Sequence, residues 1–166
     1  MKRILLASFL IILSLQLNAQ IIELPDAVIY LNSDYLNAID IENAPERVKK
    51  LEEAVLNYNN TAISDLYDDK KDIYLVSFNI PEGKIIASIN KKGEIIRTLE
   101  KYNNVRLPLE VMQAISNRFP NWGIVEDIYH IKYHCESDSL KKEYKVKIKN
   151  EDQILTIKTN EKGDFI

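Results

Sequence analysis

The chain has 166 residues, of which 28% are charged, and its formal net charge at pH 7 is −3. This acidity argues against general nucleic-acid binding, because phosphate backbones attract basic surfaces. The length suits one domain or two very small ones. Cys135 is the only cysteine, so no internal disulfide can form and we expect core packing to hold the fold together.

The first 19 residues have the organisation of a secretory signal peptide. Lys2 and Arg3 precede an apolar run from Ile4 to Leu15, and a small-residue site ending at Ala19 follows. The run is shorter than the ~20 residues that a membrane-spanning helix needs, so an uncleaved anchor is the weaker alternative. We expect cleavage after Ala19, which removes two positive charges and leaves a mature chain of formal net charge −5 in the periplasm or outside the cell.

Residues 20–42 form an N-terminal segment in which 27–31 are compatible with a short strand and 34–39 with a helical turn. Residues 43–102 are predicted to form a first unit. Its helix begins near Pro45 and ends in the asparagine-rich stretch 57–60, with Val48, Leu51 and Val55 facing the core and Glu52 assigned to solvent. After an acidic loop, alternation and turn residues predict strands over 74–80, 85–89 and 94–99.

Residues 103–166 repeat this order. A helix is predicted from 107–110 to the stop at 119–121, followed by strands over 123–134, 143–149, 154–159 and a short one over 164–166. Residues 74–96 align without a gap on residues 144–166, which indicates duplicated structure. We therefore predict an α+β protein of two repeated units, each a helix packed on one face of an antiparallel β-meander, with the other sheet face open.

Few side chains suggest catalysis or metal binding. His130 and His134 lie four residues apart in a predicted strand, about 13 Å, which is too far to share a zinc ion. Cys135 has no recognisable catalytic base nearby. The carboxylates between Asp65 and Asp72 lack the glycine and distal glutamate of a calcium loop, which favours a solvated turn. Phosphate-loop, dinucleotide and hydrolase motifs are absent, so we expect the protein to have no enzymatic activity and to bind no cofactor or metal.

The strand pattern predicts a binding surface on the open face. Two sets of alternate residues define the core side of the sheet: Tyr74, Val76 and Phe78 in the first unit, and Tyr144, Val146 and Ile148 in the second. A basic group then lies on the other side, with more apolar residues at matched positions of the first unit: Lys132, Lys145, Lys147, Lys149 and Lys158, and Leu75 and Ile86. Such a surface suits an extended peptide or another protein, and an ordinary solvated face is the alternative.

Several segments resemble the PepSY-like family of small exported proteins, whose fold is similar to the tandem β-lactamase inhibitor protein. The resemblance rests on packing and turn motifs over about residues 48–166: Ala87-Ser88-Ile89-Asn90-Lys91-Lys92-Gly93, Leu107-Pro108, Arg118-Phe119-Pro120-Asn121-Trp122, and Tyr144, Val146 and Asn160 to Phe165. It implies a helix against a four-stranded sheet in each unit, a location in the cell envelope or outside it, and binding or inhibition of another protein. Inhibition of a β-lactamase does not follow, because the short turn 80–84 gives no reason to assume its interface.

The resulting hypothesis is an exported, non-enzymatic binding or inhibitory module that recognises a protein, peptide or envelope component through its open sheet face. It has no nucleic-acid partner and no membrane span after signal cleavage. One alternative is a self-associating structural or stress-related envelope protein. A disfavoured alternative is a nucleotidyltransferase of the nicotinate-nucleotide adenylyltransferase type, because no glycine lies between His130 and His134 as its H-x-G-H-type motif requires.

Overall fold

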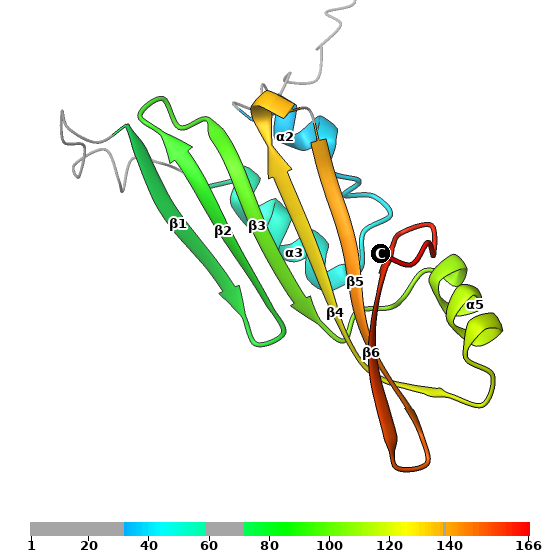
Figure 1. Cartoon of the computed structure of the whole chain (residues 1–166). Coiled ribbons are helices and arrows are strands. Elements are labelled where there is room, and N and C mark those ends of the chain that lie inside the picture. Colours follow the sequence, from blue (N-terminus) through cyan, green and yellow to red (C-terminus); the bar gives the residue numbers. More distant parts are fainter. Residues whose placement is uncertain (1–31, 59–71, 138) are drawn as a thin grey trace, which may run out of the picture.

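The computed structural model describes residues 32–58, 72–137 and 139–166 (Figure 1). Within these ranges lie helices α2 (Ser33–Ala38), α3 (Glu46–Leu56) and α5 (Leu109–Arg118) and the short 3-10 helix η1 (Cys135–Ser137). Strands are β1 (Ile73–Ile80), β2 (Gly83–Asn90), β3 (Ile95–Asn103), β4 (Gly123–His134), β5 (Ser139–Asn150) and β6 (Gln153–Asn160). The predicted signal peptide, the strand over 27–31 and most of the acidic loop 65–72 lie outside the described residues.

The predicted division into two helix-plus-meander units is wrong. The six strands form one antiparallel sheet in the order β1-β2-β3-β4-β5-β6 (Figure 1). β3 pairs with β4 from Arg97 opposite His134 to Asn103 opposite Ile128. The backbone N–H and C=O groups at the facing edges of the two meanders therefore hydrogen-bond to each other. Without this pairing, both edges would carry unpaired backbone groups. One sheet with a shared core results.

The helices also occupy unequal places. α3 packs on β1 and β2, whereas α5 lies beside the sheet, next to the C-terminal turn (Figure 1). That turn approaches α5 so closely that a Cβ atom on Gly163 would lie 2.7 Å from the carbonyl oxygen of Glu110. The rings of Phe119 and Phe165 pack edge to face with centroids 6.0 Å apart. The second helix therefore closes one end of the fold instead of covering a sheet of its own.

Most individual elements are confirmed. The helices predicted at 34–39, at 45 to 57–60 and at 107–121 correspond to α2, α3 and α5, and the strand predicted over 123–134 is β4. The strand predicted over 164–166 is reduced to a single bridge between Thr159 and Phe165. Within the described ranges, every helix is too short or too polar to cross a bilayer.

The same asparagine-centred turn follows β2 and β6. The side-chain oxygen of Asn90 accepts hydrogen bonds from the backbone N–H groups two and four residues later, at 2.9 and 3.0 Å, and Asn160 accepts the equivalent bonds at 3.0 and 2.9 Å. Gly93 and Gly163 have φ of 83° and 84°, a left-handed conformation that favours glycine. The aligned segments thus share their turns, although the larger units differ.

Alternation along the strands separates a core side from an open side. The predicted core residues Tyr144, Val146 and Ile148 are buried, and Val76 and Phe78 are half-buried against the same cluster. Tyr35 on α2 packs against Tyr133 on this side, with ring centroids 5.1 Å apart. α2 and α3 therefore cover one face of the sheet, and the core lies beneath them.

A bulge reverses the facing of residues within β3. Ile89 lies opposite Ile95, but Ser88 lies opposite Arg97, so Ile96 is the extra residue. Beyond it, Thr98, Glu100 and Tyr102 face the core and are buried, whereas Leu99 is exposed.

Glu100 places an ionisable group at the centre of this core. Its carboxylate accepts hydrogen bonds from the hydroxyl groups of Tyr35, Thr98 and Tyr102, at 2.9, 2.7 and 2.9 Å. Burial raises the pKa of Glu100, while these hydroxyl groups and the positive charge of Lys142 oppose the rise. Three donors compensate for the loss of water around the carboxyl group.

Candidate functional site

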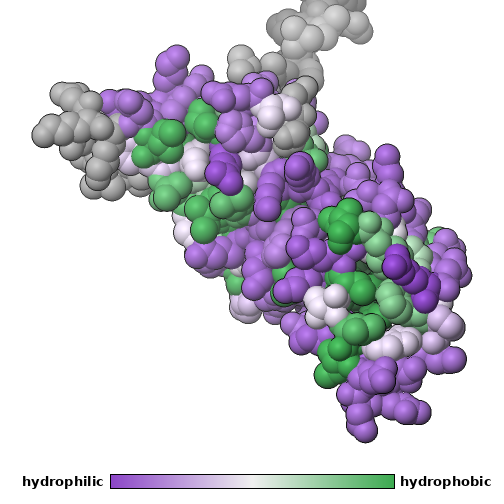
Figure 2. Space-filling model, viewed as in Figure 1, coloured by the Kyte–Doolittle hydropathy of each residue, from purple (hydrophilic) through white to green (hydrophobic). Residues whose placement is uncertain are grey.

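The open face consists of strand side chains turned away from α3, and it is the face seen in Figure 2. Lys145, Lys147 and Lys149 lie on it because they alternate along β5 with the buried residues of the core. Lys132 on β4 and Lys158 on β6 lie on the same side. The structure thus places all five predicted lysines on one surface.

Three pairs of lysines lie directly opposite each other across strands of this face. Lys84 faces Lys101, Lys132 faces Lys141, and Lys145 faces Lys158. Directly opposed residues of an antiparallel pair have Cβ atoms about 4.5–5.5 Å apart, and like charges at that distance repel. Sequence reasoning missed Lys84, Lys101 and Lys141, because finding them requires the register between strands.

Only part of this positive charge is neutralised by neighbours. The ammonium of Lys147 donates to Glu126 at 2.6 Å, which lowers the pKa of that carboxyl group, and Lys158 pairs with Glu143 at 3.4 Å. Within the described ranges, no ion pair reaches Lys132, Lys145 or Lys149. The open face therefore carries net positive charge on a chain that is acidic as a whole.

His130 lies in the middle of this positive charge. Its pKa is lowered first by partial burial and then by Lys101, Lys132 and Lys145, while Glu143 opposes them. His134 lies four residues along the same strand, and its Nδ1 accepts a hydrogen bond from the backbone N–H of Glu136 at 3.2 Å.

Cys135 is half-buried at the start of η1. In the part of the chain that the structure describes, no three histidine, cysteine, aspartate or glutamate side chains gather as metal ligands would.

The end of the open face formed by β1 to β3 is more apolar than the middle of the face. Leu75 is 72% exposed, and Ile86 lies directly opposite Leu99. Figure 2 shows hydrophobic side chains over these strands, hydrophilic ones across the middle of the face, and further hydrophobic ones at its opposite end. The structure thus brings the two predicted apolar residues, Leu75 and Ile86, onto the same surface as the lysines.

Neither a protein-family model nor a curated protein matches the chain. The resemblance to PepSY-like proteins therefore stays a prediction, and the function is argued from the surface itself.

Proposed function

We propose that the protein is a non-enzymatic binding module that takes an acidic protein or peptide on its open sheet face. The three opposed lysine pairs carry this proposal. Each pair costs the isolated fold a few tenths of a kcal/mol, and carboxylates of a partner placed between the ammonium groups relieve that repulsion. Relief of the repulsion between paired lysines thus adds to the binding free energy of an acidic ligand.

The layout of the face suits an extended chain. Adjacent strands lie about 4.8 Å apart, and alternate residues along one strand are about 6.6–6.8 Å apart. The three lysine pairs lie in adjacent cross-strand rows, one pair to a row, so an extended peptide lying across the face can reach more than one pair. Leu75, Ile86 and Leu99 supply apolar contact beyond the basic part. Charge then steers the approach and apolar contact adds to affinity. With the predicted signal peptide, the partner belongs to the cell envelope or its surroundings.

A fluorescent peptide of twelve glutamates tests the proposal directly. We expect binding by anisotropy at 50 mM NaCl, and about tenfold weaker binding when Lys132, Lys145 and Lys158 are all changed to glutamine, because three surface charge contacts contribute about 0.5 kcal/mol each. The matched control changes Lys50, Lys92 and Lys162, which are exposed on α3 and in the two asparagine turns.

Equal weakening in both triple variants would mean that net charge, not this face, attracts the peptide. A single-stranded DNA of twelve nucleotides is the second probe. If it binds the face more tightly than the peptide does, the partner is a nucleic acid and the proposal is wrong. Thermal unfolding of both variants confirms that the fold is retained.

Self-association is a second candidate, supported by β1. This strand stands at one end of the strand order, and its Ile73 and Leu75 side chains are 53% and 72% exposed. An apolar strand at a sheet edge is a template for pairing with another copy. Sedimentation velocity between 5 and 100 µM distinguishes the candidates, because self-association raises the mean sedimentation coefficient without any added peptide.

The sheet itself disfavours the nucleotidyltransferase. Enzymes of that type use a doubly wound sheet, whereas every strand pairing among the described residues is antiparallel.

A further inference from the structure

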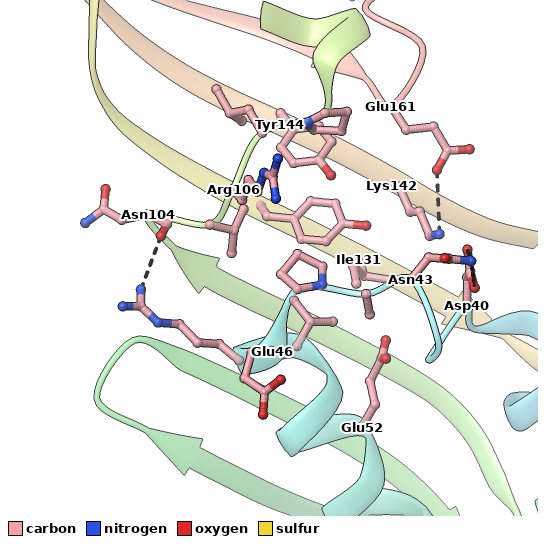
Figure 3. Close-up of a pocket in the computed structure, with 18 of the residues that line it drawn as sticks. Asp40, Asn43, Glu46, Glu52, Asn104, Arg106, Ile131, Lys142, Tyr144 and Glu161 are labelled. Atoms are coloured by element: carbon pink, nitrogen blue, oxygen red, sulfur yellow. Dashed lines mark hydrogen bonds and ion pairs between the residues drawn. The ribbon is translucent and has the colours of Figure 1, made fainter.

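A cleft of about 850 Å³ lies on the core side of the sheet, between α3 and α5. Its floor is formed by β4 and β5, one wall by the start of α3, and the other wall by residues 104–108 and the first turn of α5 (Figure 3). It is separate from the open face, which lies on the other side of the same strands. The cleft has the volume of a small-molecule site.

The wall formed by residues 104–108 is fixed in place by hydrogen bonds. The backbone N–H of Val105 donates to the carboxylate of Asp127 at 3.0 Å, and the N–H of Asn104 donates to the carbonyl of Asp127 at 2.9 Å. Arg47 of α3 donates across the opening to the carbonyl of Asn104 at 3.2 Å. The cleft is therefore built into the fold, and a ligand would not have to order this wall.

Glu52 occupies the deep end of the cleft. The residue is only 2% exposed, and Figure 3 shows its carboxyl group directed into the cleft. Its Oε2 atom is buried without a hydrogen-bond partner among the described residues. A buried carboxyl oxygen with no donor is costly, and native proteins usually provide one. An ionised Glu52 would thus need a hydrogen-bond donor that the described residues do not supply.

The surrounding charges favour a cationic donor. The pKa of Glu52 is raised to about 8, first by burial and then by the negative charges of Glu100 and Asp40, while the positive charge of Lys142 opposes the rise. Lys142 is already paired with Glu161 at 3.6 Å. The tyrosine hydroxyl groups that interact electrostatically with Glu52 are those of Tyr35, Tyr102 and Tyr129. The deep end therefore has more acidic than basic groups, and a second cation would be attracted there.

The rest of the cleft is lined with apolar and aromatic groups. The rings of Tyr129 and Tyr144 stack at the floor with centroids 4.4 Å apart and planes 8° apart. Val48, Leu107 and Met112 contribute the apolar walls. An apolar body fits against these surfaces, and a flat ring can also pack on the tyrosine edges.

We propose that the cleft binds a small organic amine whose ammonium group donates to Glu52 and whose apolar body, of about phenylalkyl size, packs between α3 and α5. This inference is independent of the binding proposed for the open face. Because an ammonium beside Glu52 favours the ionised carboxylate, binding at pH 7 should release close to one proton.

The experiment compares 2-phenylethylamine with 2-phenylethanol, which has the same body without the charge. Calorimetric titration of the purified protein at pH 7, in two buffers of different ionisation enthalpy, gives the affinity and the protons released. We expect the amine to bind, the alcohol to bind at least tenfold more weakly, and E52Q to reduce the affinity for the amine at least tenfold. E53Q is the matched control, because Glu53 is the exposed neighbour on α3.

Proton release is measured on the unaltered protein, so it tests the idea even if E52Q folds poorly. Binding of the amine with no proton released, equal binding of amine and alcohol, or undiminished binding to a folded E52Q would each overturn the assignment. The absence of heat with the amine up to 10 mM would overturn it as well. None of these outcomes bears on capture of the glutamate peptide, which uses the other face.

Discussion

Replacing Glu52 by glutamine should stabilise the protein at neutral pH but not in acid. The pKa of Glu52 is about 8 in the folded chain against 4.5 for the unperturbed group. Because the folded pKa is the higher one, the folded state keeps a proton that the unfolded state loses. The contribution of this proton to the free energy of unfolding is complete below pH 4.5. It falls as the pH rises and is lost by pH 8.

The size of the effect follows from the two pKa values. Between pH 4.5 and pH 7, ionisation of Glu52 stabilises the unfolded state relative to the folded state by about 1.36 kcal/mol per pH unit, or about 3 kcal/mol in all. This loss of folding stability approaches 5 kcal/mol by pH 9. Glutamine has nearly the same shape as the protonated acid and carries no charge at any pH. E52Q should therefore match the wild type at pH 4 and exceed it by about 3 kcal/mol at pH 7.

Urea unfolding at pH 4, 7 and 9 measures this difference. Burial also raises the pKa values of Glu100 and Asp127. The contribution of Asp127 cancels when E52Q is compared with the wild type, whereas Glu100 interacts with Glu52, so the measured difference belongs to this coupled pair. E53Q should unfold like the wild type at all three pH values. If E52Q differs from the wild type by the same amount at pH 4 and pH 9, the carboxyl group is not protonated in the folded state and the reasoning fails.

Three further substitutions test the packing and the charges. Gly163→Ala should lower the melting temperature by 10 °C or more, because φ is 84° and the new Cβ would lie 2.7 Å from a carbonyl oxygen of α5, whereas Gly123→Ala, whose nearest atom is 3.9 Å away, should change it little. Tyr102→Phe removes one of three donors to the buried glutamate of β3 and should cost about 1.5–3 kcal/mol in urea unfolding. Lys141→Glu places a negative charge directly opposite Lys132 and should raise the free energy of unfolding by about 0.5–1 kcal/mol in 20 mM salt. This increase should disappear in 1 M NaCl.

The positions of most strands and helices could be predicted, because each depends on a pattern within a few residues. The facing of residues in β3 could not. Plain alternation from Ile95 would turn Leu99 inward and Glu100 outward, and the bulge at Ile96 reverses both. No residue in that stretch signals a bulge. The burial of Glu100 and its three hydroxyl donors consequently could not be predicted from the sequence.

Glu52 shows a different reason for error. It was assigned to solvent because it is charged, yet it follows Leu51 and lies four residues after Val48, on the stripe that ends at Val55. Its helical position predicted burial and its chemistry predicted exposure. The structure buries it. Conflict of this kind between position and residue type is a useful sequence signal for a buried carboxyl group.

Pairing between β3 and β4 was the remaining feature that local patterns did not reveal. Alternation identifies a strand but not its neighbour, and both helix-then-meander segments had the same local signals whether they formed one sheet or two. For the open face, the sequence supplied the lysines of β5 through their alternation with apolar residues. The opposed partners on β2, β3 and β5 depended on register and so required the structure.

The strand order of the sheet has a consequence for how the chain folds. Every strand pairs only with the strands next to it in the sequence, so most contacts form between segments close along the chain. Antiparallel hairpins of this kind assemble locally and give a lower contact order than sheets with crossovers. The exception is β3 with β4, whose ends are joined by residues 104–122, including α5. Closing that loop is the step that we expect to limit the folding rate, so substitutions within it should slow refolding more than changes in the short hairpin turns.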